Sequence, residues 1–259
     1  MLEWSFFNKI YCINLIERND RYEHIKKISN EYNMNINFYR TERNKNSGEE
    51  GCFYSHISVI KDAFKNNYDN IIILEDDLQP FNITQKRIND VVNFIKHNDF
   101  DIFYIGICPD IRKNENIIFD KKSKIYSIKS LGAHAYILNK KSIKKFYNIS
   151  YEGTAIDVYY NNNCFKSYGI YPSLFYQFGF TSDITHGFNV HNKISPKLIK
   201  NYTKFMEKYC FYIGWSLYKL LCIIIIFSII TIILKVKFLF FFLFFIILIF
   251  IQIIVRLTN

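Results

Sequence analysis

Short apolar runs alternate with amphipathic segments along most of the chain, and an almost unbroken apolar stretch closes it. Runs of four to eight apolar residues are typical of buried strands, whereas apolar residues three and four positions apart indicate helices. We expect strands or extended segments at 9–16, 36–39, 70–74, 101–106, 116–129, 133–138 and 170–176. We expect helices at 20–32, 51–64, 84–97, 139–147 and 156–165.

This alternation predicts one α/β domain with a mostly parallel central sheet, covering residues 1–205. A length near 200 residues suits a single domain with a complete core. Sheets of this class bind ligands at the carboxyl ends of their strands. The residues that follow the apolar runs are therefore the first candidates for a functional site.

The closing apolar stretch predicts a pair of transmembrane helices, at 211–234 and 238–255, with Lys235 and Lys237 between them. One bilayer crossing needs about 20 apolar residues, so this stretch is too long for one helix. The alternative is a helical hairpin buried in a soluble core. Because both segments are apolar on every face, the pattern favours lipid, and we expect a multi-pass membrane-anchored protein.

Two sequence features give opposite predictions of the side of the membrane on which the domain lies. Four basic residues flank the apolar pair on the domain side and two lie in its turn, which favours a cytosolic domain. Three Asn-x-Ser/Thr triplets would instead suit a lumenal one. Both topologies stay open, with the positive charges favouring the cytosol.

Charge and cysteine content narrow the function classes. The chain of 259 residues has a formal net charge of +10, but its basic residues are scattered and no nucleic-acid-binding module stands out. We expect no nucleic-acid partner, and a basic surface suits phosphate-rich ligands or anionic lipid. The six cysteines are widely spaced without a CxxC pair, which indicates free thiols rather than a disulfide framework or a zinc finger.

The acidic triplet Glu75-Asp76-Asp77 is the central candidate, because a buried apolar run leads directly into it. Adjacent carboxylates repel one another unless a cation neutralises them. Their oxygens suit Mg²⁺ or Mn²⁺, which can bridge a diphosphate. Strand alternation predicts that Glu75 and Asp77 share one direction and Asp76 takes the other. The alternative is a solvated acidic loop with a helix-capping role.

Two further elements fall at strand-to-helix junctions. Ser55 and His56 follow Gly51 at the start of a predicted helix, where free backbone N–H groups attract phosphate. Arg18 and Arg21, three residues apart after the first strand, can face one ligand. Each element also has an ordinary interpretation, as a helix start with a surface histidine or as surface charge.

Together these elements resemble glycosyltransferase family 25, the lipopolysaccharide and collagen galactosyltransferase type. The resemblance extends over about residues 9–187 and rests on six elements in order. They are Ile13-Asn14-Leu15 with Arg18 and Arg21; Gly51-Cys52 with Ser55-His56; Glu75-Asp76-Asp77; Ala135-Tyr136-Ile137-Leu138-Asn139-Lys140-Lys141; Asp157; and Pro172, Gln177 and Ser182-Asp183-Ile184.

The resemblance implies a GT-A type nucleotide-sugar-binding fold and an inverting, metal-dependent hexosyltransferase. The donor would be a UDP-sugar, with galactose or glucose favoured, and the acceptor a hydroxyl on a glycan, lipid or protein. It implies that the acidic triplet acts as the metal-binding motif. The expected metal ligands are Glu75, Asp77 and His186, with His191 as a competitor for the last place. Asp157 is the expected general base, with Asp183 as its competitor. The expected donor-binding residues are Asn14, Arg18, Arg21, Ser55, His56 and Asp76.

Two other functions remain possible interpretations of the same residues. The first alternative is a catalytically inactive, membrane-anchored scaffold that binds a nucleotide sugar, which UDP binding without transfer would reveal. A metal-dependent phosphohydrolase is the second alternative, although such enzymes usually carry more Asp and His ligands downstream than this chain offers. A purely structural membrane protein does not account for the long α/β region.

Overall fold

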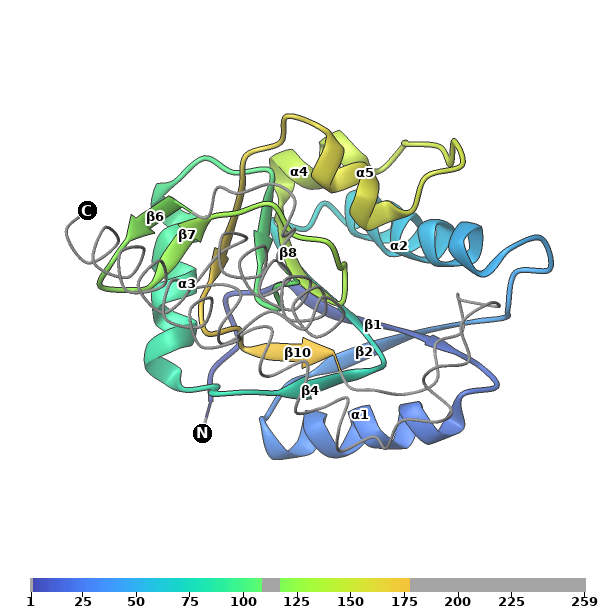
Figure 1. Ribbon diagram of the computed structural model, residues 1–259. Helices are drawn as coiled ribbons and strands as arrows, with labels where there is room; N and C mark the ends of the chain where they lie inside the picture. Colours follow the sequence, from blue (N-terminus) through green and yellow to red (C-terminus); the bar gives the residue numbers. More distant parts are fainter. Residues whose placement is uncertain (1, 109–116, 178–259) are drawn as a thin grey trace, which may run out of the picture. The chain divides into compact units, whose positions relative to one another are not determined.

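The computed structural model describes residues 2–108 and 117–177, which form ten strands and five helices. The predicted alternation of strands and helices is confirmed in this part of the chain (Figure 1). The strands are β1 (Lys9–Leu15), β2 (Ile36–Thr41), β3 (Asn70–Glu75), β4 (Leu78–Pro80), β5 (Ile102–Tyr104), β6 (Ile117–Asp120), β7 (Ile125–Ser127), β8 (Ala135–Asn139), β9 (Ser167–Ile170) and β10 (Phe175–Gln177). The helices are α1 (Asn19–Glu31), α2 (Gly48–Lys65), α3 (Gln85–His97), α4 (Lys140–Phe146) and α5 (Ile156–Asn162).

The central sheet has eight strands in the order β2-β1-β3-β8-β5-β9-β7-β6, and β10 and β4 form a separate antiparallel pair. Strands β2, β1, β3, β5, β9 and β6 run in one direction, whereas β8 and β7 run in the opposite one. The predicted mostly parallel sheet is thus confirmed in strand direction. The insertion of β8 between β3 and β5 makes the pairing mixed.

Two apolar clusters cover the two faces of this sheet. Alternation along β3 sends Ile72 and Leu74 to the cluster that contains residues of α1 and α3. Ile71 and Ile73 point to the opposite cluster, which contains residues of α2, α4 and α5. Because each of these four side chains is fully buried, β3 is fixed from both faces at the centre of the domain.

The ends of two elements differ from the sequence prediction in ways that shape the candidate site. Helix α2 begins at Gly48, three residues before the predicted start, because the Ser47 hydroxyl accepts a hydrogen bond from the Glu50 N–H and caps the helix. Strand β3 ends at Glu75 and β4 begins at Leu78, so Asp76 and Asp77 form a turn.

Several predictions fall on residues that the structure does not describe. They concern the two apolar segments at 211–234 and 238–255, the end of the domain at 205, and the candidate residues Asp183, His186 and His191. Within the described ranges, every helix is too short or too polar to cross a bilayer. The membrane anchor and its topology therefore stay predictions.

Candidate active site

A pocket opens where β1, β2 and β3 end beside the first turns of α2. These three strands are parallel neighbours, so their carboxyl ends meet at one edge of the sheet, as the fold class predicts. The pocket encloses about 770 Å³ of space, open solvent included. It is lined by Ile13, Leu15, Arg21, Thr41, Glu42, Arg43, Asn44, Gly48, Gly51, Cys52, Ser55, His56, Glu75, Asp76, Asp77 and Gln177.

Protein donors hold both oxygens of Asp76. Arg21 Nη1 lies 2.7 Å from Asp76 Oδ1, and Asn14 Nδ2 donates to Asp76 Oδ2 at 2.7 Å. All three side chains are buried. Burial raises the pKa of Asp76, and the Arg21 charge with the two hydrogen bonds only partly opposes this rise. Asp76 therefore serves to position Arg21 under the pocket.

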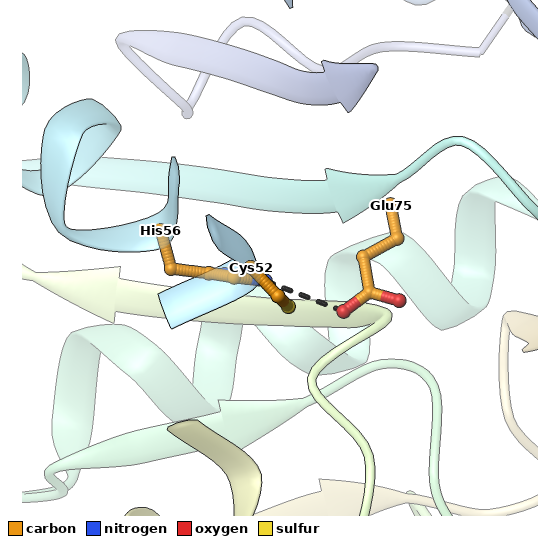
Figure 2. Close-up of side chains that lie close together, drawn as sticks. All are labelled: Cys52, His56 and Glu75. Carbon is orange, nitrogen blue, oxygen red and sulfur yellow. Dashed lines mark hydrogen bonds and ion pairs between the residues drawn. The ribbon is translucent and has the colours of Figure 1, made fainter. Parts of the chain in front are cut away.

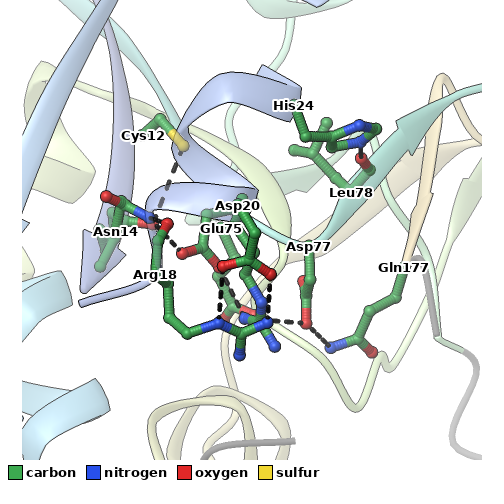
Figure 3. A network of polar contacts seen from close by, with 12 residues as sticks. Cys12, Asn14, Arg18, Asp20, His24, Glu75, Asp77, Leu78 and Gln177 are labelled. Carbon is green, nitrogen blue, oxygen red and sulfur yellow. Dashed lines mark hydrogen bonds and ion pairs between the residues drawn. The ribbon is translucent and has the colours of Figure 1, made fainter. Parts of the chain in front are cut away.

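Of the two carboxylate oxygens of Asp77, only one has a hydrogen-bond partner among the described residues. Its Oδ2 accepts a hydrogen bond from Gln177 Nε2 at 3.1 Å and lies 3.8 Å from Arg21 Nη1 (Figure 3). Its Oδ1 is buried and has no hydrogen-bond partner among the described residues. Burial, followed by the Glu75 charge, raises the pKa of Asp77 to about 7. A divalent cation with oxygen preference fits this carboxylate, because it would satisfy Oδ1 and offset the repulsion from Glu75.

Glu75 points toward α2 instead. His56 Nε2 lies 3.3 Å from Glu75 Oε1, and His56 Nδ1 is hydrogen-bonded to the Tyr136 hydroxyl at 2.9 Å. Burial raises the pKa of Glu75, but the hydrogen bond and charge of His56 outweigh it and the net shift is downward. The prediction that Glu75 and Asp77 share one direction assumed that the strand continues through both residues. The strand ends at Glu75, so alternation does not continue, and Arg21 reaches both Asp76 and Asp77.

The structure brings together most of the predicted donor-binding residues. Arg21, Ser55, His56 and Asp76 line the pocket with Glu75 and Asp77. The Ser55 hydroxyl donates to the Gly51 carbonyl at 2.7 Å, so its proton is already used. Asn14 is fully buried and bonded to Asp76, which makes it a support for the acidic turn.

Arg18 does not line the pocket. Its guanidinium donates from Nε and Nη2 to the two oxygens of Asp20, at 3.0 and 2.9 Å. These contacts hold it at the start of α1, where the backbone turns out of β1. Of the two arginines predicted to face one ligand, Arg21 lines the pocket and Arg18 does not.

Asp157, the predicted base, lies in the first turn of α5, which packs against α2. Its Oδ1 accepts a hydrogen bond from the Val158 N–H at 2.8 Å. Burial raises the pKa of Asp157, and the negative charge of Glu75 adds to the rise. The Asp157 charge in turn contributes to raising the pKa of the Cys52 thiol, whose main cause is burial. Asp157 is therefore electrically coupled to the pocket, although it is not one of the residues that line it.

Some site residues lacked an assigned role in the sequence prediction. Gln177 reaches Asp77 because β10 pairs with β4, and this pairing places Gln177 opposite Leu78, the residue after the acidic turn. Arg40 donates from Nε to Asn14 Oδ1 at 3.1 Å and so braces the support of Asp76. Residues 41–44 also line the pocket and were not predicted to do so. They follow β2, which is a parallel neighbour of β1, so the rule that parallel strands end at one edge could have indicated them.

Arg21→Gln is expected to lower the free energy of unfolding by about 3–5 kcal/mol, because it leaves the Asp76 carboxylate buried without its ionic partner. Urea denaturation monitored by circular dichroism measures this change. Arg18→Gln is the matched control, because its partner Asp20 is 56% exposed and a surface pair contributes about 0–1 kcal/mol. Equal losses in the two variants would contradict the assignment of Arg21 as the buried anchor.

Metal-free protein is expected to lose stability as the pH rises from about 4 to about 7, in part because of Asp77. Its folded-state pKa of about 7 lies above the ordinary 3.8, so the native state holds an extra proton in this window. Asp77→Asn should therefore have a higher Tm than the unsubstituted protein near pH 8, whereas the two should agree near pH 4. Thermal melts with and without Mn²⁺ measure this difference. A Tm difference independent of pH would argue against a strained Asp77.

Part of the chain that contains this site matches the model of a known protein family. Residues 40–160 match the model of glycosyltransferase family 25, described as an LPS biosynthesis protein. No curated protein matches the chain. The match includes α2, the acidic triplet, β8 and Asp157.

Two solved structures are similar at low level. The crystal structure of A197 from STIV is 11% identical, with a TM-score of 0.42 over 67% of this chain and 86% of that one. A glycosyltransferase involved in the glycosylation of the major capsid of PBCV-1 is 12% identical, with a TM-score of 0.32 over 53% of this chain and 63% of that one. At these TM-scores neither likeness carries an argument about activity. The resemblance predicted from the motifs is confirmed by the family match, in which residues 40–160 are similar to glycosyltransferase family 25.

Proposed function

We propose that this protein transfers a hexose, galactose or glucose, from a UDP-sugar to a hydroxyl group on a glycan, lipid or protein. The reaction uses Mn²⁺ or Mg²⁺, inverts the sugar carbon and takes place on a GT-A type fold. The family match supports a glycosyl-transfer role. The observation that carries the finer proposal is the pocket in which Glu75, Asp76 and Asp77 lie beside Arg21 and the N-terminal turns of α2.

Asp77, with Glu75 beside it, is the group that would hold the cation. The buried, unpartnered Oδ1 of Asp77 supplies a ligand atom, and Gln177 fixes the other oxygen. A bound divalent cation would neutralise charge on the departing UDP. His186 is the predicted further ligand and lies outside the described residues.

The donor diphosphate is expected between the acidic turn and the start of α2. Gly48, the first residue of α2, lines the pocket, so the start of the helix borders the space expected for the diphosphate. The N-terminus of a helix attracts phosphate through its free N–H groups. Arg21 adds a positive charge beside the acidic turn, where Asp76 holds it.

Asp157 acts as the general base in this proposal. The acceptor hydroxyl gives its proton to the Asp157 carboxylate while its oxygen bonds to the anomeric carbon of the donor. The bond from that carbon to the diphosphate breaks at the same time, and UDP leaves with the electron pair. The raised pKa of Asp157, caused mainly by burial, makes it a better proton acceptor than an exposed aspartate. Asp183 remains the competing base.

The proposal is tested by measuring UDP release from a panel of UDP-sugars by the full-length protein, with Mn²⁺ and with chelator. Release with one sugar, dependent on metal and increased by an acceptor, is the expected result. UDP binding by calorimetry without any release would instead favour the inactive scaffold. Neither binding nor release would overturn the proposal, and phosphate release from the donor would favour the phosphohydrolase.

A further inference from the structure

The side chains of Cys52, His56 and Glu75, all of types that can bind a metal, lie close together (Figure 2). All three line the pocket. One ligand atom of each residue lies within 4.8 Å of the other two. Cys52 and His56 are four residues apart on α2, so they share one face of the helix, and Glu75 meets them from the end of β3. This mixture of sulfur, nitrogen and oxygen ligands differs from the all-oxygen surroundings that suit Mn²⁺ or Mg²⁺.

His56 is held in the orientation of a metal ligand. Its side chain is fully buried, and the ring is fixed by the hydrogen bond between Nδ1 and the Tyr136 hydroxyl. Histidines that bind metals commonly use one ring nitrogen for the metal and the other for such a partner. When Nδ1 carries the proton and donates to Tyr136, the Nε2 lone pair faces Glu75 Oε1, and two acceptors then oppose each other at 3.3 Å. In the other tautomer Nε2 donates its proton to Glu75 Oε1, and a cation bound between the two atoms would take the place of that proton.

The spacing fits a small tetrahedral cation. With bonds of roughly 2.0–2.3 Å, two ligands of a tetrahedral zinc lie roughly 3.3–3.8 Å apart. The separation of 3.3 Å between Nε2 and Oε1 already has this value. The Cys52 sulfur lies within 4.8 Å of both other ligand atoms, so a shift of roughly 1.5 Å or less brings it to this spacing, and a side-chain torsion can supply that shift.

We propose that Cys52, His56 and Glu75 bind Zn²⁺, with water in the fourth position. The Cys52 thiol gives its proton to solvent as its sulfur bonds to the metal. Sequence spacing did not reveal this site, because two ligands come from a helix and the third from a strand end. The site shares Glu75 with the cation position at Asp77, whereas Cys52 and His56 belong to the zinc site alone.

Because Glu75 is common to both cation sites, zinc binding is expected to affect catalysis, an expectation that rests on the proposed glycosyl transfer. Zinc on Glu75 would withdraw that carboxylate from the acidic triplet and occupy the wall of the donor pocket. Zn²⁺ is therefore expected to inhibit Mn²⁺-dependent transfer, with inhibition depending on the Cys52 thiol. The binding of zinc itself does not depend on any transferase activity.

Cobalt binding to the full-length, metal-free protein tests the site directly, because a cobalt–thiolate bond absorbs in the near ultraviolet. We expect one Co²⁺ per chain with this band, displaced by Zn²⁺. Cys52→Ser should remove the band and weaken Zn²⁺ binding at least about tenfold. Cys164→Ser, which changes an exposed thiol outside the pocket, should keep both. Asp77→Asn should also keep the band, since Asp77 is no ligand of this site.

Absence of the band in the unsubstituted protein would overturn the proposal, as would its persistence in Cys52→Ser. Cys52→Ala serves as a second variant, and a cooperative thermal melt shows that each variant is folded. The inhibition is measured as the Zn²⁺ concentration that halves UDP release, with each protein normalised to its own rate without zinc. This concentration should be at least about tenfold higher for Cys52→Ser than for the unsubstituted protein. If no UDP-sugar is turned over, the proposed function fails while the cobalt result still decides the zinc site.

Discussion

Asp77→Asn is expected to lower the turnover number for UDP release by at least about 10³-fold, because a bound metal supplies several kcal/mol of transition-state stabilisation. The substitution keeps the size of the side chain and its hydrogen bond from Gln177. It removes the negative charge that lies beside Glu75 in the pocket. The loss should therefore reflect metal binding and not a change in fold.

Initial rates over a range of Mn²⁺ concentrations measure this effect. The variant should show no saturation with metal where the unsubstituted protein does. Asp69→Asn is the matched control, because Asp69 is exposed and pairs with Lys140 outside the pocket at 3.3 Å. Its rate should stay within about twofold, as expected for a surface substitution. Turnover by Asp77→Asn within tenfold of the unsubstituted protein would remove Asp77 from the metal site.

The sequence predicted the position of the site because its strongest signal is local. An apolar run that enters three carboxylates identifies the end of a buried strand, and parallel strands gather such ends at one edge. The beginning of α2 and the β1–α1 junction follow from the same rule. Arg21, His56 and the triplet therefore meet as predicted, although they are far apart along the chain.

The directions of the side chains did not follow from local pattern. Strand periodicity holds only while the strand continues, and β3 ends at Glu75, where it still pairs with Ile13 of β1. Asp76 and Asp77 lie in a turn whose conformation is set by Arg21 and by the short β4–β10 pair. Those contacts join segments that are 55 and 100 residues apart along the chain, and one sequence does not reveal how such segments align.

The sequence pattern also did not show which of two nearby polar residues lines the pocket and which supports another side chain. Asn14 and Arg18 follow one another closely at the end of β1, and both were predicted to bind the donor. Asn14 is buried and donates a hydrogen bond to Asp76 in the acidic turn. Arg18 instead forms an ion pair with Asp20. Residue type and spacing indicate that a polar residue belongs to a site, but burial decides whether it contacts the ligand or supports a residue that does.

Asp157→Asn is expected to lower turnover by about 10²–10⁴-fold, the usual contribution of a general base, while leaving UDP binding intact. The carboxylate must be ionised to accept the proton of the acceptor hydroxyl. Since burial and the charge of Glu75 raise the pKa of Asp157, the rate of the unsubstituted protein should fall on acidification at a higher pH than for an ordinary aspartate. The variant should lose this acid limb, because an amide does not titrate.

Glu152→Gln is the control for this prediction, because it removes a carboxylate from the exposed segment that precedes α5 without changing the pocket. Calorimetry of UDP with Mn²⁺ separates the two steps, since a base acts on the acceptor and Asp77 acts on the donor. Loss of turnover with normal UDP affinity assigns Asp157 to the chemical step. Full turnover in Asp157→Asn would exclude Asp157 as the base and leave Asp183 as the remaining candidate for that role.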